Sequence, residues 1–176
     1  MRFWRGGIAC AVALGLAIAA PASAQTDAAA RSNTFTGQCH YAGSIVFEDP
    51  LGAVPEENSL RMGMDGTCSG WLDGARVDGE PVWFYGEATG LMSCTQGLPS
   101  GTGGLVFDDT VISFTFREYR LTGGGKTQFD GVDGGSLHGV GATDDDTAEQ
   151  VQSCTEGDGS LGEASIYGDV VGTISG

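Results

Sequence analysis

Apolar and polar residues alternate along much of this chain, and the alternation predicts a β-sheet. From Thr34 to Glu48 the odd positions are apolar, aromatic, cysteine or glycine residues, and most of the even positions are polar. The same two-residue period returns in 60–72, 82–94, 111–120 and 164–174. A period of two is typical of a strand that buries one face. Each of these segments is therefore predicted to be a half-buried strand.

Short groups of glycine, aspartate and proline separate these segments and predict the turns. Asp73-Gly74 and Asp78-Gly79 are turn signals, and Asp49-Pro50 is expected to end the first strand. The acidic run 144–146 is expected to be an exposed loop, and no stretch of twelve or more residues has a helical period. We therefore predict an all-β fold, either an antiparallel β-sandwich or a β-barrel of roughly eight to ten strands.

The N-terminal residues have the three parts of a signal peptide. Arg2 and Arg5 supply the positive charge, 8–20 is an apolar stretch, and Ala22-Ser23-Ala24 is a small-residue cleavage site. The apolar stretch is too short to cross a hydrocarbon core, which takes about 20 residues. We expect 1–24 to be a signal peptide and the protein to be secreted or held in the cell envelope.

The remaining chain is expected to comprise a flexible segment, 25–33, and a single β domain, 34–176. No segment after the signal peptide approaches the roughly 18 apolar residues of a membrane-spanning helix. Cleavage removes Arg2 and Arg5 but no acidic residue, which takes the formal charge from −15 to −17. Such a charge repels nucleic acid and anionic membranes, so we expect no nucleic-acid partner. A basic protein or an envelope component remains compatible with it.

The cysteines indicate a disulfide framework. Cys10 leaves with the signal peptide, and an even number remains: Cys39, Cys68, Cys94 and Cys154. No C-x-x-C pair is present, which disfavours a structural zinc site. Four cysteines allow three connectivities. The alternation places Cys39 and Cys68 on the inward faces of their strands, which favours a Cys39–Cys68 disulfide and, by elimination, a Cys94–Cys154 disulfide. All three connectivities stay open.

Candidate catalytic and metal-binding residues are few. Ser136 and His138 share a strand face, but they do not complete a G-x-S-x-G motif. Among 23 acidic residues a hydrolase could use a carboxylate pair that the sequence does not locate. Asp130, Asp133 and the run 144–146 are candidate calcium ligands, although no EF-hand spacing is present. We predict no cofactor, and keep a secreted hydrolase and a calcium-binding domain as alternatives.

Three aromatic residues, Trp71, Trp83 and Tyr85, fall on the outward parity of their predicted strands. Outward aromatic rings on a sheet suit binding to sugar rings or to a protein partner. The alternative is that a second sheet or a long loop covers them. These residues form the candidate binding surface.

The run Gly37-Gln38-Cys39-His40-Tyr41-Ala42-Gly43-Ser44-Ile45-Val46-Phe47, with Pro50-Leu51, 66–70 and 111–116, resembles small secreted cysteine-containing proteins of high-GC Gram-positive bacteria. The resemblance covers most of the predicted mature chain, and it implies export and a β-fold. It implies no activity, because that group has no assigned function. We therefore expect a non-catalytic binding or structural module.

Overall fold

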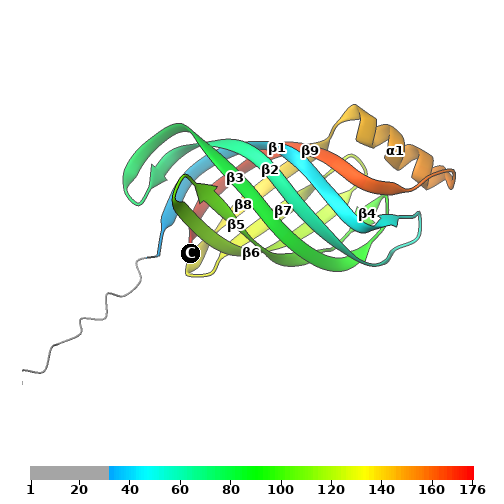
Figure 1. Cartoon of the computed structure of the whole chain (residues 1–176), viewed down its shortest axis with the longest axis horizontal. Coiled ribbons are helices and arrows are strands. Elements are labelled where there is room, and N and C mark those ends of the chain that lie inside the picture. Colours follow the sequence, from blue (N-terminus) through cyan, green and yellow to red (C-terminus); the bar gives the residue numbers. More distant parts are fainter. Residues whose placement is uncertain (1–31) are drawn as a thin grey trace, which may run out of the picture. The chain divides into compact units, whose positions relative to one another are not determined.

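The computed structural model describes residues 32–176, whose strands wrap around a common axis with one helix at one end (Figure 1). In chain order, the elements are β1 (Thr34–Leu51), β2 (Glu56–Leu72), β3 (Ala75–Met92), β4 (Gln96–Gly97), β5 (Ser100–Phe107), β6 (Thr110–Leu121), β7 (Gly124–Gly131), β8 (Gly134–Thr143), α1 (Asp145–Glu156) and β9 (Leu161–Ser175). The predicted signal peptide, 1–24, lies outside the described residues, as does most of the predicted flexible segment.

Eight of the nine strands form a closed barrel, because each of them pairs antiparallel with a neighbour on both sides. The order around the wall is β1, β2, β3, β5, β6, β7, β8 and β9, and β9 pairs with β1. The two-residue β4 pairs with the last residue of β3 and with the end of β6. The predicted antiparallel all-β fold is confirmed, and the barrel is the architecture that forms.

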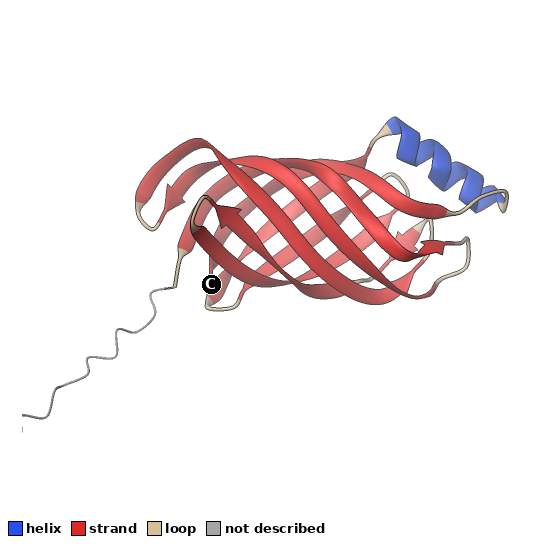
Figure 2. Ribbon diagram, viewed as in Figure 1, coloured by secondary structure: helices blue, strands red, loops and turns tan. Residues whose placement is uncertain are grey.

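The two ends of the barrel are built differently. At one end, which we call the turn end, two-residue turns at 73–74, 108–109 and 132–133 join consecutive strands. At the other, the helix end, lie the longer connections, 52–55 and 93–99, together with α1; Figure 2 shows this helix in blue beside the ends of the strands.

Inward side chains fill the barrel with apolar groups. Near its middle, Phe84, Phe114, Phe116 and Phe129 pack together, with ring centroids between 4.9 and 6.5 Å apart. Gly103 faces this cluster, and a Cβ there would lie 2.9 Å from the Phe114 ring, too close for a real side chain. Buried aromatic rings contribute much of a core's stability, so this cluster is the main apolar support of the wall.

Two disulfides cross-link the described residues, and they join Cys39 to Cys68 and Cys94 to Cys154. Cys39 and Cys68 are directly opposite each other on β1 and β2, and both are buried. The second bridge ties the connection after β3 to α1. The prediction of two disulfides is confirmed, and of the three connectivities the one favoured by strand parity is present.

The helix α1 corrects the prediction of a loop at the acidic run. Asp144 caps the helix, since its carboxylate accepts from the Thr147 backbone N–H at 2.8 Å, and Asp145 and Asp146 fall in the first turn. Acidic residues are favoured there by the helix dipole. Gly157 ends α1 in the left-handed conformation, with φ of 87°. The twelve-residue α1 is short, and no helix within residues 32–176 is long and apolar enough to cross a membrane.

Two further expectations about strand boundaries are wrong. The first strand does not end at Asp49-Pro50, because β1 continues past a shift in register to Leu51, which pairs with Leu161. A proline is tolerated at such an irregularity, where its missing N–H breaks no regular ladder. Asp78-Gly79 is not a turn but an irregularity within β3, where the register with β2 shifts and Gly79 has φ of 73°.

Candidate functional site

The outer wall carries two of the three aromatic residues predicted to form a binding surface. Trp83 and Tyr85 occupy successive outward positions on β3 and are 42% and 41% exposed. Outward positions on one strand lie about 7 Å apart, so their rings share one part of the wall. Neither a second sheet nor a loop covers them in the described part of the chain.

Glycines on the neighbouring strands let both rings lie against the backbone. A Cβ on Gly104 would stand 2.8, 2.8 and 2.9 Å from Cε1, Oη and Cζ of Tyr85. These nearly equal distances mean that Tyr85 lies with one ring face on Gly104. On the other side of β3, the Cη2–Cζ2 edge of Trp83 leans on Gly63, where a Cβ would lie 2.8 and 3.0 Å from those atoms. The outward face of Tyr85 is left to solvent.

A groove of about 490 Å³ begins at Glu87, the next outward position of β3 after Tyr85. Its lining includes outward polar groups on the same strands, among them Arg61, Glu87 and Thr102. Arg61 Nε lies 3.1 Å from Glu87 Oε1, and both side chains are highly exposed. Hydrogen-bonding groups therefore continue the outward face of β3 beyond Tyr85. We call Trp83, Tyr85 and this groove the aromatic surface.

Trp71 lies elsewhere on the wall. It sits opposite Thr36 and Arg76, next to the β2–β3 turn, and is 56% exposed. Trp83 is opposite Asp65, which is six residues from Trp71 along β2, or about 20 Å. The structure thus brings together two of the three predicted residues and separates the third.

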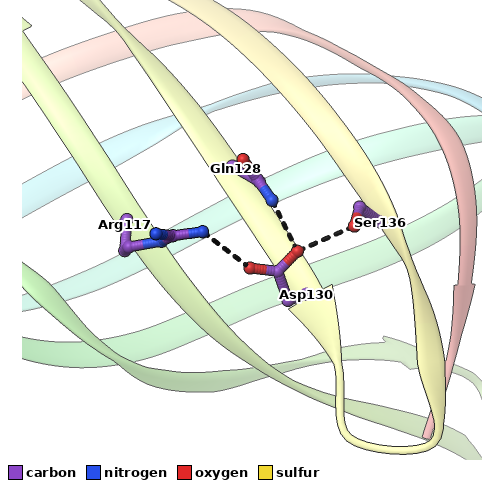
Figure 3. A network of polar contacts seen from close by, with 4 residues as sticks. All are labelled: Arg117, Gln128, Asp130 and Ser136. Carbon is purple, nitrogen blue, oxygen red and sulfur yellow. Dashed lines mark hydrogen bonds and ion pairs between the residues drawn. The ribbon is translucent and has the colours of Figure 1, made fainter.

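A polar network occupies the outer wall across β6, β7 and β8 (Figure 3). The Asp130 carboxylate accepts hydrogen bonds from Gln128 Nε2 and from Ser136 Oγ, both at 2.7 Å, and Arg117 Nη2 lies 3.5 Å away. The bond from Gln128 contributes most to lowering the pKa of Asp130, followed by that from Ser136. The Ser136 hydroxyl is therefore engaged by Asp130 rather than directed at His138. Asp130 is held as an ionised acceptor on the surface.

The other histidine lies on the outer wall as well. His40 Nδ1 is 3.1 Å from Asp169 Oδ1, and both side chains are largely exposed. His40 and His138 line a broad groove of about 1040 Å³ that crosses the outward faces of β6 to β9 and of β1 and β2. No serine or cysteine nucleophile is paired with either histidine in the described residues.

The candidate calcium ligands are not brought together. Asp133 lies in the β7–β8 turn, and the run 144–146 lies beyond the opposite end of β8. Asp144 is engaged in capping α1, and its hydrogen bonds to Thr147 lower its pKa. Within residues 32–176, no three histidine, cysteine or acidic side chains gather in a manner that could hold a metal ion.

Charged residues also lie inside the barrel, at its helix end. Glu118 and Arg120 follow Phe116 on the inward face of β6, and their side chains are 13% and 9% exposed. Arg120 Nε lies 3.9 Å from Glu118 Oε1, which is an ion pair but too long for a hydrogen bond. The Arg120 guanidinium stacks on Phe47, with Cζ 4.9 Å from the ring centroid.

Burial controls the protonation of this inner pair. It raises the pKa of Glu118, although the nearby Arg120 charge lowers it in part, and it lowers the pKa of Arg120. Tyr41, on the facing wall, has a pKa raised to about 12 by burial, with smaller contributions from the charges of Glu118 and Asp169. Desolvation thus acts against charge on all three inward groups.

The sequence analysis missed Glu118 and Arg120, although a signal was present. Ile112, Phe114 and Phe116 set the inward parity of β6, and positions 118 and 120 continue it. Charged residues at positions that face inward interrupt the alternation of apolar and polar residues. Such interruptions are typical of functional or specially stabilised positions.

Comparison of the chain with protein-family models, with curated proteins and with solved structures finds no match.

Proposed function

We propose that this protein is a non-catalytic module that binds a neutral glycan chain on its aromatic surface outside the cytoplasm. The observation that carries the proposal is the arrangement of Trp83 and Tyr85, whose rings lie against glycines on the outer wall. A groove lined by hydrogen-bonding side chains begins at the next outward position of β3. The apolar faces of sugar rings stack on such rings, while their hydroxyl groups bond to flanking polar groups.

Charge and covalent structure support the same proposal. A neutral glycan is not repelled by a chain of formal charge −15 or lower, whereas anionic polymers are. Two disulfides fit an oxidising, extracytoplasmic compartment, in which envelope and extracellular glycans are found.

The distribution of the carboxylates favours binding over hydrolysis. Within residues 32–176, three acidic side chains have shifted pKa values. Glu118 lies inside the barrel, Asp130 on its outer wall and Asp144 at the helix cap. A glycosidase needs two carboxyl groups that face one bond from a single cleft. None of these three adjoins the aromatic surface, where the groove is lined by an exposed Glu48 and by Glu87, which is paired with Arg61.

Affinity electrophoresis in gels that contain a β-glucan, a mannan or a xylan tests the proposal. We expect the exported protein to be retarded by at least one of these polymers. Trp83→Ala and Tyr85→Ala should each reduce the retardation at least tenfold in apparent affinity, since stacked rings are the main contacts.

Matched controls come from the same wall. Trp71→Ala removes a tryptophan that is more exposed than Trp83, at 56% against 42%, and Tyr167→Ala removes a tyrosine that is 48% exposed on β9. Both should leave the retardation unchanged. A folded wild-type protein that no neutral glycan retards, or a Trp83→Ala variant that matches the wild type, contradicts the proposal.

A further inference from the structure

A separate cavity lies inside the barrel at the helix end, away from the aromatic surface. It has a volume of about 30 Å³, and its walls come from β1, β2 and β6 to β9, with Val151 of α1 and Cys94 also contributing. A space of this size holds about one water molecule or one small ion. The cavity is thus a small site, bordered on one side by the exposed Leu121 and Gly123, with room for a single small species.

Two buried polar atoms in this cavity's walls have no partner. They are Nη1 of Arg120 and Oγ1 of Thr143, and no other side-chain nitrogen or oxygen within residues 32–176 is both buried and unpaired. Arg120 is 8% exposed. A buried donor without an acceptor is costly, and in native proteins such groups nearly always bind something. The two atoms together indicate an occupant.

The surroundings of Arg120 define the charge of that occupant. Glu118 approaches Nε from 3.9 Å, and Phe47 covers one face of the guanidinium, so neither satisfies Nη1. Guanidinium groups only donate hydrogen bonds, and the hydroxyl of Thr143 can donate as well. Tyr41 and Thr127, which carry hydroxyl groups, also line the cavity. An acceptor with a negative charge fits this set best.

The ionisable groups of the cavity agree with an anion. Tyr41, Glu118 and Arg120 are the titratable side chains that line it. Glu118 stays 3.9 Å from Arg120 Nε and does not reach Nη1, so Arg120 lacks a counter-charge in direct contact on that side. Burial also raises the pKa of Glu118. A bound anion supplies that counter-charge.

We propose that this cavity binds one small monovalent anion of about the size of chloride, held by Arg120 Nη1 and Thr143 Oγ1. The site is independent of glycan binding, because none of its residues belongs to the aromatic surface.

Crystals grown in sodium bromide give the direct test, because bromide scatters anomalously. We expect an anomalous peak in the cavity, within hydrogen-bond distance of Arg120 Nη1. A cavity that holds only an ordered water, with no anomalous peak, overturns the proposal.

Thermal unfolding provides the second test. Sodium chloride should raise the melting temperature above that in equimolar sodium gluconate, whose anion is too large to enter, since a ligand that binds the folded state stabilises it. Arg120→Met, which keeps an unbranched apolar side chain beside Phe47 but removes the guanidinium donors, should abolish the difference. Arg76→Met, at an exposed arginine on the outer wall, should retain it.

If the Arg120→Met variant does not fold, Thr143→Val provides the same test, because valine has about the volume of threonine and lacks only the hydroxyl. It should reduce the chloride effect at least threefold. An equal chloride effect in the wild type and in either inner variant contradicts the anion site, whatever the outcome of the glycan experiments.

Discussion

The two ends of the barrel follow different rules. At the turn end, two-residue turns join the strands, and the interior is apolar: Phe35 and Phe107 contact at 5.2 Å between ring centroids, and Ile112 and Ile174 are fully buried. At the helix end, longer connections and a disulfide surround an interior that contains Glu118, Arg120 and a small cavity. One end is built for stability alone, whereas the other keeps charges inside at a cost that a purely structural barrel would avoid.

The largest expected effect tests the apolar end. Phe107→Ala should lower the free energy of unfolding by about 3 to 5 kcal/mol, because it leaves a cavity beside Phe35. Urea denaturation measures the change. Val111→Ala, at an exposed position on the same hairpin, should change it by no more than about 0.5 kcal/mol. Similar losses in the two variants would show that Phe107 is not part of a tightly packed end.

The next effect concerns the bridge at the helix end. Replacing Cys94 and Cys154 together by alanine opens a loop of 60 residues and should cost about 2 to 4 kcal/mol. Hydrogen exchange should show α1 losing its protection before the strands of the turn end. If α1 stays as protected as β6 in the double variant, contacts other than the disulfide hold the helix in place.

A smaller effect, dependent on pH, tests the inner charges. The pKa of Glu118 is raised in the folded state above its ordinary value of 4.5, so the folded protein binds this proton more tightly than the unfolded chain. Stability is therefore lost as the pH rises above about 4.5 and through the folded pKa, by up to about 1.4 kcal/mol per pH unit.

Glu118→Gln removes this titration. The unfolding free energy of the wild type minus that of the variant should fall as the pH increases over that window. A difference that stays flat, or that grows with pH, would mean that Glu118 is not desolvated as the structure indicates.

The smallest effect is local to the cap of α1. The hydrogen bond to Thr147 lowers the pKa of Asp144, so its contribution is present above the ordinary pKa of 3.8 and is lost as the pH falls through the folded pKa. Asp144→Ala should raise amide exchange in the first turn of α1 at neutral pH and leave the β-strands unchanged. Faster exchange throughout the barrel would contradict this local role.

The turn end could be predicted from the sequence because it obeys local rules. The alternation in β1 and β6 indicates which side chains face inward, and Asp73-Gly74 forms the turn that its residue types favour, with φ of 51° and 80°. The same alternation predicts that Trp83 and Tyr85 face outward. The glycines that support them, Gly63 and Gly104, could not be identified without knowing the register between the strands.

The helix end could not be predicted in the same way. The buried positions of α1 are Thr147, Val151 and Cys154, and only one of these is an ordinary apolar residue, so the helical period is weak. Its capping residues, Asp144 and Gly157, are of the types that commonly begin and end helices. The cavity could not have been foreseen, because it depends on how residues from six strands and α1 meet in space.

The pairing of β9 with β1 has a consequence for how the chain reaches its native state. Every other pair in the wall joins strands that are neighbours in the sequence or separated only by the two-residue β4, whereas this one brings Thr34 beside Ser175. Until β1 and β9 pair, both strands expose long rows of unpaired N–H and C=O groups, which are templates for aggregation. Closure is non-local and therefore slow, so the protein is most vulnerable while its last strand is still free. Removing the C-terminal strand would make that vulnerable state permanent.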